Sequence, residues 1–173
     1  MTKELTPVEA DTLNAYATIA ANRNRTHADP DIWRAEAQKL KALMRPGRIL
    51  DIGCGSGRDA LLLESMDMEY TGVDLSPEML AAAREMAPDA DFRVMSLYSL
   101  RFAADTFAAF WAAAVWLHVP RERIQEALRE AHRVTLEGGV GFIALKEGDG
   151  EHVAPDGRGF TYWRADAFSA ALV

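Results

Sequence analysis

The chain has 173 residues, of which 49% are hydrophobic and 26% charged, a composition typical of a globular protein and unlike that of a disordered one. This length suffices for one core of ordinary size and is too short for two such domains. With 19 basic and 26 acidic residues, the formal net charge of −7 argues against a protein that coats DNA or RNA. One cysteine excludes an internal disulfide framework and favours a reducing compartment, and no apolar run reaches the roughly 18 residues of a membrane span. We expect a cytoplasmic, single-domain protein with neither a membrane nor a nucleic-acid partner.

The hydrophobic pattern alternates between the periods of helices and strands. Thr6 and Ser76 are expected N-caps, each followed by a proline at the first helical position, and Gly138-Gly139 is expected to end a helix. In chain order the pattern predicts a helix over 7–22, a loop over 22–29, a helix over 31–44, a strand over 48–52, a helix over 58–66, a strand over 70–73, a helix over 77–86, strands over 91–95 and 107–113, a helix over 121–135, a strand over 140–145, a loop over 148–159, an extended stretch over 161–163 and a last helix over 165–173.

Strands that alternate with helices indicate βαβ crossovers and a mostly parallel sheet. Runs such as RILDI and GFIAL are apolar without alternation, as strands covered on both faces are. We therefore expect an α/β fold, a Rossmann-like three-layer sandwich with a mostly parallel sheet of about five strands. Ligands bind such sheets at the carboxyl ends of the strands. The expected site is formed by the loops after Ile52, Val73, Met95 and Ala113.

The strongest signal is the glycine-rich stretch ILDIGCGSGR at residues 49–58, where a buried strand runs into a turn and then a helix. Glycine is needed where the backbone takes a positive φ or where a ligand touches the main chain. Asp51 can accept hydrogen bonds from the amino group of a ligand or from loop amides. The alternative is that Asp51 only caps the turn.

A second acid, Asp74, ends the next strand, 23 residues after Asp51. An acid at the tip of the second strand is placed to bind both hydroxyls of a ribose. The alternative is a solvated loop acid. Together, in one βαβ unit, Asp51 and Asp74 indicate a bound nucleoside.

The spacing of the glycines distinguishes between nucleosides. Gly53, Gly55 and Gly57 form G-x-G-x-G, and Arg58 stands where the dinucleotide fingerprint G-x-G-x-x-G has its third glycine. That fingerprint holds a pyrophosphate at a helix N-terminus. An acid beside the loop repels a polyanion and favours a cationic ligand.

Four segments, LDIGCGSG (50–57), GVDLSPEML (72–80), LHVP (117–120) and LEGG (136–139), together resemble the class I S-adenosylmethionine-dependent methyltransferases, closest to their small-molecule branch. The resemblance implies strand order 3-2-1-4-5, S-adenosylmethionine as methyl donor and S-adenosylhomocysteine as product. It also implies one domain over 1–173, with a helical lid over 1–45 and a Rossmann-like core over 46–173.

The resemblance further implies a set of cofactor contacts from the loops at the strand ends. These are Asp51, Gly53, Cys54 and Gly55 at the methionine part, Asp74 at the ribose, Leu75, Met79, Ser96 and Leu97 around the adenine, the backbone of Ala112 and Ala113 at the ammonium, and Tyr16 in the lid.

The chain departs from the family pattern in three places. Ala108-Ala109 replaces an Asp-Gly pair at the start of the fourth strand, and Ser96 replaces an acid near the adenine amino group. The antiparallel hairpin that completes a seven-stranded sheet is expected to be absent. The strand at 141–145 would then be an exposed apolar edge, so we expect a shortened gene product that forms homo-oligomers through it.

His118, just after the fourth strand, is the best candidate for a general base or an acceptor-orienting group. The alternative is a packing role at the turn. His27, His132 and His152 lack metal-ligand spacing, and no metal is expected.

Cys54 lies between two glycines, where it could be a nucleophile, but we favour a small side chain that packs behind the loop. Among the aromatic residues we expect Trp111 in the core and Trp116 and Tyr162 in an acceptor pocket.

The leading functional hypothesis is a methyltransferase acting on a small-molecule acceptor. The second is a non-catalytic module that binds S-adenosylmethionine or its product, and the third is a nicotinamide-dependent oxidoreductase. The acceptor and the type of atom methylated do not follow from the sequence.

Overall fold

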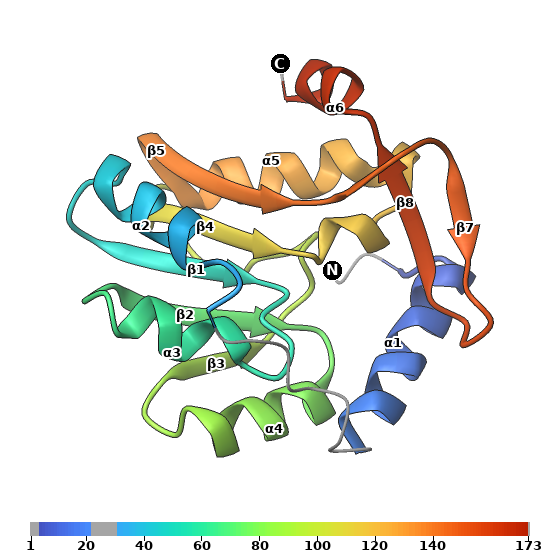
Figure 1. The fold of residues 1–173 in the computed structure, drawn as a ribbon, viewed down its shortest axis with the longest axis horizontal. Helices are drawn as coiled ribbons and strands as arrows, with labels where there is room; N and C mark the ends of the chain where they lie inside the picture. Colours follow the sequence, from blue (N-terminus) through green and yellow to red (C-terminus); the bar gives the residue numbers. More distant parts are fainter. Residues whose placement is uncertain (1–3, 22–30, 173) are drawn as a thin grey trace.

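The computed structural model describes residues 4–21 and 31–172 (Figure 1). Its α-helices are α1 (Pro7–Ala21), α2 (Arg34–Leu43), α3 (Arg58–Glu64), α4 (Pro77–Met86), α5 (Ile124–Val134) and α6 (Ala165–Ala171), with short 3-10 helices η2 (Trp116–His118) and η3 (Arg121–Arg123). Its strands are β1 (Arg48–Ile52), β2 (Glu69–Asp74), β3 (Asp91–Val94), β4 (Phe107–Ala113), β5 (Thr135–Ala144), β6 (Lys146–Glu147), β7 (Glu151–Val153) and β8 (Gly159–Trp163). The loop predicted over 22–29 lies outside the described residues.

The main sheet has the order β3-β2-β1-β4-β5 with every pair parallel, which confirms the predicted fold class and strand order. Side chains of successive strand residues point to opposite faces. In β1, Ile49 packs with α2, α3 and α4, whereas Leu50 packs with α5. Both faces are thus covered, and this explains why the strands are apolar without alternation.

Helix starts follow the local sequence. The Thr6 hydroxyl accepts from the Glu9 amide and the Glu9 carboxylate accepts from the Thr6 amide at 2.7 Å, a reciprocal capping box at α1. The Ser76 hydroxyl accepts from the Met79 amide at the start of α4. Both predicted N-caps are confirmed.

The helix predicted over 121–135 is present as η3 followed by α5, which ends at Val134. The strand predicted over 140–145 was wrong at its start, because β5 already begins at Thr135. Gly138 and Gly139 therefore lie inside a strand instead of ending a helix. The β4–β5 register shifts between Phe107 and Ala109, Gly138 has φ +69°, and a Cβ at Gly139 would lie 2.9 Å from the Ala108 carbonyl. The glycines serve a bulge and a close backbone approach.

The loop predicted over 148–159 was also wrong, because it contains β7. β7 pairs antiparallel with β8, and β8 pairs parallel with β6, which makes a second three-stranded sheet beside α1 (Figure 1). This antiparallel pair does not extend the main sheet. In the part of the chain that is described, β5 has β4 as its one strand neighbour and is an edge strand.

The two N-terminal helices have different positions. α1 packs against α4 and β8, whereas α2 packs against β5 and α3. The boundary of a lid at residue 45 stays a prediction. Within 4–21 and 31–172, no helix is both long and apolar enough to cross a membrane.

Candidate functional site

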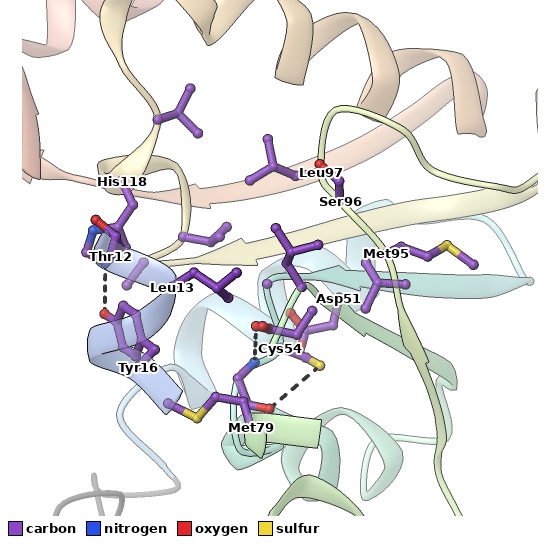
Figure 2. Close-up of a pocket in the computed structure, with 18 of the residues that line it drawn as sticks. Thr12, Leu13, Tyr16, Asp51, Cys54, Met79, Met95, Ser96, Leu97 and His118 are labelled. Atoms are coloured by element: carbon purple, nitrogen blue, oxygen red, sulfur yellow. Dashed lines mark hydrogen bonds between the residues drawn. The ribbon is translucent and has the colours of Figure 1, made fainter. Parts of the chain in front are cut away.

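A cavity of about 470 Å³ opens at the carboxyl ends of β1, β2 and β4 and is bordered by α1 (Figure 2). Its size is that of a small-molecule or cofactor site. Figure 2 shows Tyr16 and His118 on the side of α1 and Asp51 and Cys54 at the glycine loop. Leu97 lies beside Ser96, in the segment after β3.

Nearly all of the predicted site residues line this cavity. They are Tyr16, Asp51, Gly53, Cys54, Gly55, Asp74, Leu75, Met79, Ser96, Leu97, Ala113 and His118. Ala112, whose backbone was predicted to meet the ligand, is not among the lining residues, and its side chain is fully buried in the core cluster that includes α5. The wall there is formed by Ala113, Ala114 and Val115.

The glycine loop has the positive φ angles that its composition predicted. Gly53, Gly55 and Gly57 have φ values of +72°, +55° and +80°. The Gly53 amide donates to the Val73 carbonyl at 2.7 Å, and a Cβ on Gly53 would lie 2.2 Å from the Val115 side chain. The loop is thus fastened to β2 and leaves its outer backbone facing the cavity.

Asp74 is held by backbone amides. Its carboxylate accepts from the Gly55 amide at 2.9 Å and from the Ser76 amide at 2.8 Å. Burial raises the pKa of Asp74, and these hydrogen bonds oppose the shift. Asp74 therefore joins the loop after β2 to the glycine loop, and its position does not depend on solvent.

Asp51 is almost fully buried and accepts a hydrogen bond from the Tyr70 hydroxyl at 2.8 Å. Burial, followed by the nearby charge of Asp59, raises its pKa well above the ordinary value. Asp59 itself accepts from the Arg58 guanidinium at 2.6 Å and from the Trp111 indole at 2.9 Å. The pocket wall here carries two buried carboxyl groups beside one cation, and a cationic ligand would relieve their repulsion.

Cys54 is buried, and burial raises the pKa of its thiol well above the ordinary value, helped by the charges of Asp51 and Asp74. A thiolate is the nucleophilic form of cysteine. The environment therefore disfavours the nucleophile and fits the packing role.

Tyr16 and His118 form a hydrogen-bonded chain with the backbone. The His118 Nδ1 lies 2.6 Å from the Gly159 carbonyl, which can only accept, so Nδ1 carries the proton. Nε2 then accepts from the Tyr16 hydroxyl at 2.8 Å (Figure 2). Burial lowers the pKa of His118 to about 4, with Arg158 and Lys146 adding to the shift, and burial raises the pKa of Tyr16. Both groups are neutral at pH 7.

Several lining residues were not predicted. Four come from α1, at Glu9, Thr12, Leu13 and Ile19, and Leu5 lies just before that helix. One cation, Arg158, comes from the turn before β8. The sequence of α1 has no motif that predicts these contacts, because they depend on how α1 docks.

Two aromatic residues expected in an acceptor pocket do not line it. Trp116 is fully buried and stacks on Phe110 with ring centroids 5.7 Å apart. Tyr162 lies on β8 away from the cavity lining. Trp111 is fully buried in the core as predicted. In the described ranges, no group of three histidine, cysteine or acidic side chains is arranged to hold a metal ion.

Comparisons with known proteins agree with this architecture. A family profile described as a methyltransferase domain matches residues 49–139. The malonyl-[acyl-carrier protein] O-methyltransferase of Erwinia pyrifoliae is 33% identical over 146 residues, which cover 81% of this chain and 53% of that protein. The demethylmenaquinone methyltransferase of Chlorobaculum parvum is 32% identical over 116 residues, 64% of this chain and 47% of that protein. The chain thus spans about half the length of these relatives.

Among solved structures, a Burkholderia thailandensis 1,6-didemethyltoxoflavin-N1-methyltransferase has the same fold, with a TM-score of 0.79 at 21% identity. The match covers 99% of this chain and 80% of that one. That structure was solved with 1,6-didemethyltoxoflavin and S-adenosylhomocysteine bound.

Proposed function

Because this chain belongs to the methyltransferase-domain family, as a class I S-adenosylmethionine-dependent member, we propose that it transfers a methyl group to a small-molecule acceptor. The cofactor of this family is S-adenosylmethionine. The observation that carries the proposal is that Asp51 and Asp74, at the ends of the adjacent strands β1 and β2, line one cavity together with the backbone of the glycine loop.

The residues fit this cofactor. The Asp74 carboxylate keeps acceptor capacity for the two ribose hydroxyls beyond its bonds to two amides. Leu75, Met79 and Leu97 offer apolar surfaces for the adenine. The acids near Gly53 suit a ligand that carries positive sulfonium and ammonium groups, and they would repel a pyrophosphate.

When bound, S-adenosylmethionine supplies an activated methyl carbon: the acceptor's lone pair forms a bond to it as the carbon–sulfur bond breaks, which leaves S-adenosylhomocysteine. The chain's contribution is to hold the reactants in line and to exclude water, which α1 does by bordering the cavity. A base is needed only for an acceptor that is protonated at working pH. We place Tyr16 against such an acceptor, because its hydroxyl donates to Nε2 of the neutral His118 and its oxygen can still accept a hydrogen bond.

A small acceptor fits a cavity of about 470 Å³ and a negatively charged chain better than a nucleic acid does. The relatives' names give different acceptors, a malonyl-[acyl-carrier protein] and demethylmenaquinone. The acceptor of this chain is not inferred from them.

Calorimetry with S-adenosylhomocysteine and with NADH tests the cofactor, and release of S-adenosylhomocysteine across an acceptor panel tests transfer. We expect S-adenosylhomocysteine to bind and NADH not to bind. Cofactor binding with no transfer to any acceptor would favour the non-catalytic binding module. The edge position of β5 is the observation that favours this alternative. NADH binding alone would overturn the proposal. Mass spectrometry of co-purifying small molecules gives an independent reading.

A further inference from the structure

We propose that Arg158 is an acceptor-positioning residue that binds a carboxylate on the acceptor, so that the substrate class is a small carboxylic acid. This inference rests on the proposed function and adds the chemistry of the acceptor. It is carried by four side chains, Tyr16, His118, Arg158 and Phe160, which we term the acceptor cluster.

The four side chains of the acceptor cluster contact one another in a ring. Tyr16 and His118 have ring centroids 5.2 Å apart, and His118 and Phe160 have centroids 4.8 Å apart. The Arg158 guanidinium carbon lies 5.5 Å from the Tyr16 ring centroid and 5.3 Å from that of Phe160. Two aromatic faces therefore fix a cation next to the Tyr16–His118 pair.

The backbone beside Arg158 is fixed by two elements, α1 and η2. The amide of Gly159 donates to the Thr12 hydroxyl of α1 at 2.8 Å, and its carbonyl accepts from His118 Nδ1 at 2.6 Å. A Cβ on Gly159 would lie 2.4 Å from the Val8 side chain. The position of Arg158 is thus set before any ligand binds, which lowers the entropy cost of binding.

Arg158 differs from the other cation in the cavity wall in how its charge is balanced. Arg58 pairs at 2.6 Å with Asp59, whose side chain is 5% exposed, so that charge is matched inside the protein. The partner of Arg158 is Asp156 at 2.9 Å, whose side chain is 44% exposed. An exposed carboxylate in water binds weakly, and a ligand carboxylate in the cavity can compete with it.

A second cation, Lys146, also lies near the acceptor cluster. The Lys146 ammonium lies 4.0 Å from the Phe160 ring centroid, on the ring that also carries Arg158. Among the residues that line the cavity, the acids Asp51, Asp59 and Asp74 lie at the glycine loop and the cation Arg158 lies at the α1–β8 side, where Glu9 is already paired with Arg123 at 2.7 Å. These charges complement a cationic methyl donor and an anionic acceptor. Arg158 is preferred for this role because a guanidinium binds a carboxylate through two parallel hydrogen bonds.

A carboxylate in this cavity could come from the acceptor or from the amino-acid end of the cofactor. The two sources are separated by comparing S-adenosylhomocysteine with 5′-methylthioadenosine, which has no carboxylate. If Arg158 held the cofactor, Arg158→Gln would weaken the first ligand and leave the second unchanged.

The test uses the whole chain saturated with S-adenosylhomocysteine and titrated with matched acid and amide probes, followed by ligand-observed NMR. Suitable pairs are malonate with malonamide, benzoate with benzamide, and phenylacetate with phenylacetamide. At least one acid should bind about tenfold or more tightly than its amide, since hydrogen bonds to charged groups are the strong ones. Arg158→Gln should bring that ratio to within about twofold while S-adenosylhomocysteine affinity stays the same.

Arg164→Gln is the matched control, because Arg164 also pairs with one aspartate, Asp149, at 2.9 Å but does not line the cavity. It should keep the preference for the acid. The inference is overturned if the wild-type protein prefers no acid of the panel, or if Arg158→Gln weakens S-adenosylhomocysteine about tenfold with 5′-methylthioadenosine unchanged. Wild-type protein that fails to bind S-adenosylhomocysteine at all would instead overturn the proposed function, and this inference with it.

Discussion

Gly53 and Gly55 share a positive φ, but their surroundings differ. A Cβ on Gly53 would lie 2.2 Å from Val115, whereas a Cβ on Gly55 would meet nothing within 4 Å. Gly55→Ala should therefore cost only the left-handed backbone strain, about 1–2 kcal/mol in the free energy of unfolding. Gly53→Ala adds a steric clash and should cost about 2–5 kcal/mol. Chemical denaturation of the ligand-free variants compares the two, and equal losses would contradict the role given to Val115.

Asp74 is predicted to be the main ribose contact. Asp74→Ala should weaken S-adenosylhomocysteine binding by about 2–4 kcal/mol, because it removes a charged acceptor from two hydroxyls. Isothermal calorimetry measures this change. Asp105→Asn is the control, since Asp105 is exposed and does not line the cavity. An unchanged dissociation constant for Asp74→Ala would place the nucleoside elsewhere.

His118 gives the stability of the protein a defined pH dependence. Its pKa is about 4 in the folded chain against an ordinary value of 6.5. As the pH falls below 6.5, the unfolded chain takes up a proton that folded His118 does not, so stability is lost until the pH reaches about 4. Asp51 and Asp74, whose pKa values are raised, act in the opposite direction.

Comparison with His118→Gln isolates this contribution. Between pH 7.5 and pH 5, the wild-type protein should lose about 2 kcal/mol of unfolding free energy relative to the variant. Urea denaturation of both proteins at the two pH values measures the difference. Parallel losses would mean that His118 is not buried in its neutral form.

The site residues that the sequence predicted are placed by local structure, whereas those that it missed are placed by long-range contacts. Asp51, Gly53 and Asp74 belong to one βαβ unit, whose geometry follows from the local pattern. Arg158 reaches the cavity through a hairpin far along the chain, and Glu9 through the docking of α1. Neither arrangement has a short-range signal, and Trp116 was misplaced for the same reason.

At the scale of elements, α1 is held over the cavity by a buried charged group. The Glu9 carboxylate accepts from Arg123 at 2.7 Å and from the Tyr98 hydroxyl, and the Arg123 guanidinium carbon lies 3.8 Å from the Tyr98 ring centroid. The side chains of Glu9 and Arg123 are only 7% and 10% exposed. Three distant elements thus meet at the N-terminal end of α1.

Arg123→Met should leave the Glu9 carboxylate buried without its cation and cost about 3–5 kcal/mol. Hydrogen exchange should show faster exchange over α1 than over α5. Arg164→Met, which breaks an exposed pair with Asp149, should cost less than about 1 kcal/mol. Uniformly faster exchange in all helices would contradict a local role for this group.

The bounds of helices and strands were predicted correctly where the capping residues and the hydrophobic periodicity indicate the same element. The prediction failed where a glycine pair is compatible with two different structures. α4 and β4 match their predicted bounds, since Ser76-Pro77 and a continuous apolar run define them. A glycine pair such as Gly138-Gly139 is equally compatible with the end of a helix and with a β-bulge, so the local sequence does not distinguish the two. The pairing with β4 decides between them, and that pairing is a long-range contact.

At the scale of the whole molecule, the apolar surface beside β5 supports the predicted self-association. A groove there is lined by Leu43 of α2 together with Val140 and Phe142 of β5. Leu43 is 72% exposed, and Ile32, just before α2, is 53% exposed. An edge strand flanked by exposed apolar side chains is a template for pairing with another chain, and we predict that a second copy of this chain pairs there.

Leu43→Glu tests this surface without disturbing the core, because the side chain is already exposed. It should weaken self-association, measured by sedimentation velocity over a concentration series, by about tenfold or more, since it places a charge in an apolar contact. Leu61→Glu on α3, where the side chain is 47% exposed and does not line this groove, should leave association unchanged. Both variants should keep the wild-type unfolding free energy to within about 0.5 kcal/mol. A wild-type protein that is folded and strictly monomeric at every concentration would contradict this prediction. It would mean that β5 remains an unpaired edge strand, and that Glu137, Gly138 and Gly141 within it suffice to prevent pairing.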